Sequence, residues 1–181
     1  MSCLPNTPIS SNITTAPSAN GWVAFDSVTT AALLQYYGVA AQVLTFSSVA
    51  STTNQHLVLR QLEIEETATS SANIKKSKLL VYLYTDTAPT APATNAVYNA
   101  STTNLMCAPI AIDTANYTRV SGESATTNVW TATVNPNRYI RTGTSATATN
   151  IYVVVIADQS VTYAASAGLR VKLTLENHTA L

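Results

Sequence analysis

Charge is scarce in this chain of 181 residues: only 10% are charged, and 9 Lys and Arg balance 9 Asp and Glu for a net charge of zero. Ordinary globular proteins are about 25% charged, and most free proteins keep some net charge for solubility. The densest basic cluster, Lys75, Lys76 and Lys78, is too small to follow a phosphate backbone. The composition therefore argues against nucleic-acid binding and favours a protein that stays docked on a partner.

The residues that build common catalytic and metal sites are also few: the chain has 5 glycines, 2 cysteines and 2 histidines. No phosphate-binding loop, dinucleotide-binding loop or GxSxG motif occurs. Cys3 and Cys107 lack the paired spacing of a zinc site, and a disulfide between them stays open. His56 and His178 have no acidic motif beside them, so solvated side chains are a simpler interpretation than a ligand pair or a general base. We expect no cofactor, no metal and no small-molecule substrate.

The carboxylates show no pairing that would mark a glycosidase. Glu63, Glu65 and Glu66 lie in the strand-like stretch LRQLEIEE and are interpreted as its solvent-facing side. We expect that the protein is not an enzyme.

Long apolar runs are missing as well. No stretch reaches the roughly 18 apolar residues that a membrane helix needs. The start MSCLPNTPISSNITT has neither the basic nor the apolar part of a signal peptide. We therefore expect no membrane partner and no export signal.

Threonine, alanine, serine and asparagine dominate instead, with 29, 27, 17 and 14 copies. Threonine favours strands, and serine and asparagine favour turns. Residues 1–20 show no hydrophobic period and carry only isolated apolar side chains, which predicts an extended N-terminal arm that lies on a neighbouring subunit. A β-sandwich domain would follow over residues 21–181. The candidate contacts of the arm and its attachment are Leu4, Ile9, Ile13, Trp22 and Phe25.

Short stretches rich in β-branched and apolar residues, separated by turn signals, predict eight or so strands and no long helix. They cover residues 42–46, 56–66, 79–85, 106–112, 117–121, 129–134, 139–141, 151–157 and 168–176. In the second of them, a bulge between Leu59 and Leu62 would reconcile an apolar first half with an alternating second half. The fold class expected is all-β: an antiparallel β-sandwich or jelly roll with an extended N-terminal arm.

The stretch LLVYLY is apolar on both faces, since Leu80, Tyr82 and Tyr84 alternate with three aliphatic residues. Such a strand is central in a sandwich, or a partner covers its outer face. The tract TDTAPTAPATN that follows cannot continue it and predicts a loop of the kind that is usually functional or interfacial. We take Leu80, Tyr82 and Tyr84 as candidate contacts with a partner protein or a second subunit.

One order of features recurs along residues 36–176: LRQLEIEE, LLVYLYTDTAPTAP, NAVY, CAPIAID, NIYVVVIA, VTYAASAGL and RVKLTLE. This order resembles the head decoration, or cement, proteins of tailed bacteriophages. The resemblance implies a β-sandwich subunit on the outside of a phage capsid that stabilises the shell by bridging subunits of the major capsid protein. It also implies a homo-oligomer, a trimer or a dimer, located on the virion exterior after synthesis in the host cytoplasm. No catalytic residues come with it.

A second class of function stays open beside this one. Tyrosines supply large contact areas and stack on sugars. The 9 tyrosines of the chain would therefore also suit a receptor- or carbohydrate-binding module of a phage head or tail fibre.

Overall fold

The computed structural model describes residues 23–24, 37–38, 43–91, 98–124, 127–145, 149–158, 161, 163 and 168–178. The arm expected over residues 1–20, with Leu4, Ile9 and Ile13, lies outside the described residues, and so do Trp22 and Phe25. Within them, every strand pair is antiparallel, and the helices are two three-residue 3-10 turns, Ser71–Asn73 and Thr114–Asn116. No helix in this part of the chain is long and apolar enough to cross a membrane. The expected all-β class is confirmed.

The strands form two sheets. The six-stranded sheet has the order β1 (Val23–Ala24), β11 (Gly168–Asn177), β4 (His56–Ala68), β8 (Thr127–Val134) and β7 (Tyr117–Ser124), with β9 (Arg138–Arg141) also paired to β4. The five-stranded sheet has the order β2 (Tyr37–Gly38), β10 (Ile151–Ala157), β5 (Leu79–Tyr84) and β6 (Ile110–Ile112), with β3 (Leu44–Phe46) also paired to β10.

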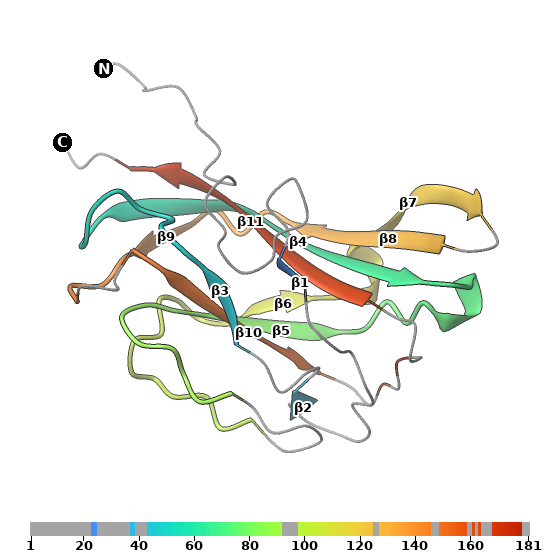
Figure 1. Cartoon of the computed structure of the whole chain (residues 1–181), viewed down its shortest axis with the longest axis horizontal. Coiled ribbons are helices and arrows are strands. Elements are labelled where there is room, and N and C mark those ends of the chain that lie inside the picture. Colours follow the sequence, from blue (N-terminus) through green and yellow to red (C-terminus); the bar gives the residue numbers. More distant parts are fainter. Residues whose placement is uncertain are drawn as a thin grey trace.

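The two sheets stack face to face, as Figure 1 shows. The chain crosses from one sheet to the other after β1, β3, β4, β6, β9 and β10. Together with the neighbour orders β1-β11-β4-β8 and β3-β10-β5-β6, this alternation is that of a jelly roll, and β7 adds one strand to the first sheet. The expected sandwich is therefore a jelly roll.

The main core lies between the sheets and is built from alternate strand positions. Leu62 and Ile64 of β4 and Val153 and Val155 of β10 all belong to this core, and all four are completely buried. Their β-branched and leucine side chains suit a pleated, buried surface. This packing accounts for the clean alternation of the sequence in β4 and β11.

Strand β4 contains the expected bulge, at Arg60. Leu59 pairs with Leu175 and Gln61 with Thr174, so Arg60 is the extra residue on β4. Because the extra residue reverses the alternation, odd-numbered positions face the core before it and even-numbered positions after it. On its other edge β4 changes partner at the same place, from β9 to β8.

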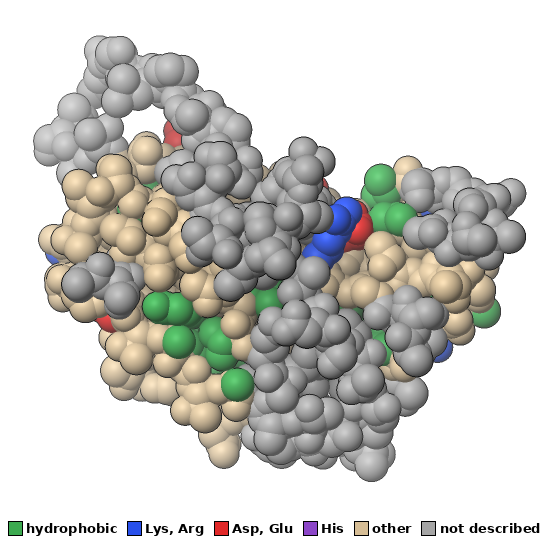
Figure 2. Space-filling model, viewed as in Figure 1, with side chains coloured by type: hydrophobic (Ala, Val, Ile, Leu, Met, Phe, Trp, Pro, Cys, Tyr) green, Lys and Arg blue, Asp and Glu red, His purple; other side chains and the backbone are tan. Residues whose placement is uncertain are grey.

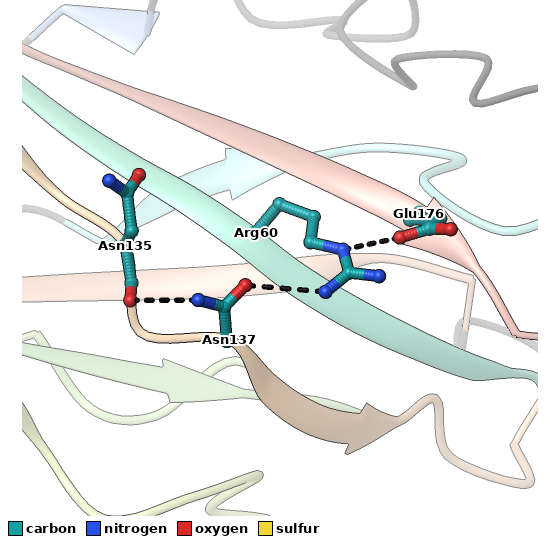
Figure 3. Close-up of polar contacts among 4 residues, drawn as sticks. All are labelled: Arg60, Asn135, Asn137 and Glu176. Carbon is teal, nitrogen blue, oxygen red and sulfur yellow. Dashed lines mark hydrogen bonds and ion pairs between the residues drawn. The ribbon is translucent and has the colours of Figure 1, made fainter.

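The Arg60 side chain ties together the elements around this bulge (Figure 3). Its guanidinium forms an ion pair with Glu176 at the end of β11 and donates a hydrogen bond of 3.3 Å to the Asn137 side chain. Asn137 in turn donates to the Asn135 carbonyl oxygen at 3.4 Å, within the turn that joins β8 to β9. One side chain therefore links β4, β11 and the β8–β9 turn where the register changes.

Candidate interaction face

The outward side of the five-stranded sheet carries a second apolar cluster, separate from the main core. We call it the tyrosine face: it is formed by Tyr82, Tyr84, Tyr152, Val154 and Ile156, with the partly buried Val43, Leu80, Tyr98, Ala100 and Leu105 packed against them. The register of β5 and β10 brings its members together, since Tyr84 pairs with Tyr152 and Tyr82 with Val154. All of β10 is buried, because one side meets the main core and the other side belongs to the tyrosine face.

The chain after β5 folds back along this sheet. The Met106 N–H donates to the Leu83 carbonyl at 2.9 Å, and the Thr85 N–H donates to the Asn104 carbonyl at 3.0 Å. These two bonds flank an isolated antiparallel bridge between Tyr84 and Leu105. The chain beyond the expected loop therefore returns at residues 104–106 to pair with the strand that the loop leaves.

Tyr98 fastens the returning chain to the sheet. Its ring meets the Tyr82 ring edge-on, with ring centroids 5.4 Å apart at an angle of 78°. Its hydroxyl shares a hydrogen bond of 2.9 Å with the Tyr84 hydroxyl. Burial and this bond raise the pKa of Tyr84, so its phenol stays neutral at physiological pH. The chain therefore covers Tyr82 and Tyr84 with its own side chains.

The three candidate contacts of β5 thus lie on one outward face but differ in exposure. Tyr82 is 7% exposed and Tyr84 is 1% exposed, whereas Leu80 is only partly buried. A partner could reach Leu80 and Tyr98 directly, but would meet the two β5 tyrosines only through what covers them. A role for these residues in a subunit contact stays a prediction. Sequence reasoning did not include Tyr152, Val154 and Ile156 in the face; the unbroken apolar run IYVVVIA was the available signal.

The opposite, outward side of the six-stranded sheet is polar. Glu65 pairs with Arg170 at 2.6 Å, and Glu63 pairs with Lys172 at 2.7 Å, each across the β4–β11 register. Glu63 and Glu65 point away from the core, as expected, but Glu65 is 6% exposed and is therefore buried by its neighbours instead of facing solvent. Among the described residues, these pairs leave no cluster of free carboxylates on this side.

The solvent-side interpretation is wrong for Glu66, which is completely buried. After the bulge, even-numbered residues of β4 point inward, so Glu66 follows Leu62 and Ile64 toward the core. Its carboxylate accepts the backbone N–H groups of Lys75 at 2.5 Å and Lys76 at 2.8 Å. Burial nevertheless raises the pKa of this carboxyl. Glu66 thus holds the turn between β4 and β5 in place.

Two buried tyrosines complete this polar anchor. Tyr117 donates its hydroxyl to the Ser77 carbonyl at 3.1 Å, and Tyr163 donates to the Ser77 hydroxyl at 2.7 Å. Burial raises the pKa of both phenols, so neither is a ready base. The Lys76 ammonium lies 4.1 Å from the centroid of the Trp130 ring, a cation–π contact at the edge of this cluster. The cluster has the features of a structural anchor.

The remaining candidates for chemistry in the described residues are one cysteine and two histidines. Cys107 is a free thiol there, and no group of three or more His, Cys, Asp or Glu side chains in this part of the chain could hold a metal ion. His56 and His178 are exposed. No protein-family model matches the chain, and no curated protein or solved structure matches it either.

Proposed function

We propose that this protein decorates the outside of a phage capsid and stabilises it by bridging subunits of the major capsid protein. The observation that supports this most is the tyrosine face. One core between two sheets is enough for a jelly roll, yet this chain gathers a second apolar cluster on the outward side of its five-stranded sheet. Leu80, Tyr98 and Val43 at its margin are only partly buried, which leaves apolar surface for a partner.

The surface composition supports the same proposal. Figure 2 shows a face of the molecule with few charged side chains among the described residues; hydrophobic atoms gather at the lower left, on the side of the five-stranded sheet, and a few others lie at the right. With 10% charged residues and zero net charge, the chain has little long-range repulsion from copies of itself. Many copies on one shell act together, so each contact can be weak while their combined contribution is large.

Residues 1–20 would lie on a neighbouring subunit, and the protein would act as a homo-oligomer, a trimer or a dimer, on the virion exterior. It would bind neither nucleic acid nor membrane, and it would catalyse no reaction.

A matched pair of substitutions tests the proposal. Leu80→Asp puts a charge at the partly exposed margin of the tyrosine face, and Val120→Asp makes the same change at a residue of β7 that is 62% exposed. Both proteins are mixed with undecorated capsids, and the bound amount is measured by co-sedimentation; circular dichroism and thermal unfolding establish that each variant is folded. Leu80→Asp should reduce the occupancy and Val120→Asp should not. Equal occupancy of wild type and a folded Leu80→Asp variant would remove this face from the proposal.

Tyr82→Asp would be a poor interface test, because Tyr82 is 7% exposed within its own chain. A charge at that position would destabilise the subunit itself by desolvation. Loss of capsid binding would then report the fold and not the contact.

A second function, binding of a receptor or a carbohydrate, has one specific observation in its favour. Tyr139 of β9 is 70% exposed on the outward side of the six-stranded sheet. An exposed aromatic ring on the surface of a sheet is a platform on which a sugar can stack. A glycan array probed with wild type and with Tyr139→Ala tests this: a glycan signal that Tyr139→Ala loses would favour the second function over the first.

A further inference from the structure

Two histidines that are far apart in the sequence meet on adjacent strands. The pairing of β11 with β4 places Glu176 opposite Val58 and Asn177 opposite Leu57. One step further, the His178 N–H donates to the His56 carbonyl oxygen at 2.9 Å. His178 therefore lies directly across from His56.

Both side chains belong to the outward side of the six-stranded sheet. Leu57 and Leu175 are buried and face the core. Because side chains alternate along a strand, His56, one residue before Leu57, and His178, three residues after Leu175, fall on the opposite side. His56 and His178 are accordingly exposed. Directly opposed residues of antiparallel strands have Cβ atoms about 5 Å apart. At this spacing two imidazoles can reach one metal ion, with each nitrogen at about 2 Å from the ion.

Side chains around the two histidines restrict the His178 ring and contribute charges of both signs. The Tyr139 ring meets the His178 ring edge-on, with centroids 5.2 Å apart at 83°, which limits its rotation. Arg141 lies opposite His56 on the other edge of β4 and adds a positive charge. Glu176, on the same side of β11, supplies a carboxylate that Arg60 partly neutralises.

We propose that His56 and His178 bind one divalent transition-metal ion, with water in its remaining coordination positions. Imidazole nitrogens suit Zn²⁺, Ni²⁺ and Cu²⁺, whereas Mg²⁺ and Ca²⁺ prefer oxygen ligands. The ion would join the end of β11 to the start of β4. Since the unfolded chain does not hold the two histidines together, binding should stabilise the fold. This inference is independent of the proposed capsid function.

The test uses the untagged full chain after removal of metal with a chelator. Calorimetric titration with ZnCl₂ is made on wild type, His56→Gln, His178→Gln and a Cys107→Ser control, and the unfolding temperature of each protein is measured with and without ZnCl₂. Wild type and Cys107→Ser should bind one ion per chain and unfold at a higher temperature with zinc. Each histidine variant should unfold at the wild-type temperature without zinc and lose both effects.

Four results would overturn the proposal. Wild type that binds no zinc would remove the site. A histidine variant that binds as wild type does would show that the ion lies elsewhere. Binding that Cys107→Ser loses would assign the ion to the thiol. MgCl₂ in place of ZnCl₂ should give neither heat of binding nor a shift, and an equal response to Mg²⁺ would contradict imidazole ligation.

Discussion

Removing a single hydroxyl group at Tyr98 tests whether the chain after β5 is fastened to the tyrosine face. The Tyr98 hydroxyl is the hydrogen-bond partner of the Tyr84 hydroxyl at 2.9 Å, and Tyr84 is 1% exposed. Tyr98→Phe leaves a buried hydroxyl without this partner, which costs about 1–3 kcal/mol. Tyr84→Phe leaves the hydroxyl of the partly exposed Tyr98, which water can reach, so its cost should be smaller, about 0.5–1.5 kcal/mol.

The double variant sharpens this test. With both hydroxyls gone, no polar group is left unpaired, so Tyr84→Phe combined with Tyr98→Phe should cost less than the sum of the two single changes. Urea unfolding of the four proteins measures these differences in free energy. The matched control is Tyr139→Phe, the same change at a residue that is 70% exposed, where the effect should stay within about 0.5 kcal/mol. Costs that add, or a Tyr98→Phe protein as stable as Tyr139→Phe, would refute the reasoning.

Three further substitutions test other contacts of the fold. Gly143→Ala should lower the free energy of unfolding by roughly 1–2 kcal/mol, because the added Cβ would lie 2.0 Å from an Asp86 carboxylate oxygen that accepts the Ser145 backbone N–H. In an Asp86→Ala background most of this cost should vanish. An unchanged cost in that background would show that the Asp86 carboxylate is not its cause. Arg60→Ala should lower the free energy of unfolding, measured in urea, by about 0.5–1 kcal/mol, since Arg60 is half exposed yet ties the bulge to Glu176; an unchanged free energy would mean that this ion pair does not stabilise the bulge. Burial raises the pKa of Glu66, so the folded state keeps this proton to higher pH than the unfolded chain does. The free energy of unfolding of wild type relative to Glu66→Gln should therefore fall as pH rises above the ordinary value of 4.5, and a rise would contradict it.

The strands were largely predictable because their signals are local. The alternation of Leu169, Val171 and Leu173 in β11 and the unbroken apolar run of β10 follow from which faces are buried. The bulge at Arg60 was predictable for the same reason, since two halves with opposite alternation cannot share one core without an extra residue. Among the predicted strands, the one over residues 106–112 agrees least with the structure, because only Ile110–Ile112 forms a strand there.

What depends on pairing between distant strands could not be predicted. Glu66 was placed on the solvent side because its neighbours are glutamates, although the alternation of Leu62 and Ile64 already puts position 66 on the core face; only its partners, two backbone N–H groups of the turn before β5, could not be predicted. His56 and His178 were interpreted as isolated because nothing in the sequence states that β11 ends beside the start of β4. For the tyrosine face, the sequence indicated the residues of β5. The residues of β10 could be assigned to the same face only from the pairing of β10 with β5.

The central proposal, that this protein stabilises a capsid, is tested most directly by a rupture measurement. Undecorated capsids, capsids saturated with wild type and capsids mixed with the folded Leu80→Asp variant are heated or subjected to osmotic shock, and release of packaged DNA is followed by dye binding. We expect wild type to raise the rupture threshold and the variant to leave it near that of bare capsids. If bare and wild-type-decorated capsids rupture at the same threshold, the protein does not stabilise the shell, and receptor or carbohydrate binding becomes the favoured function.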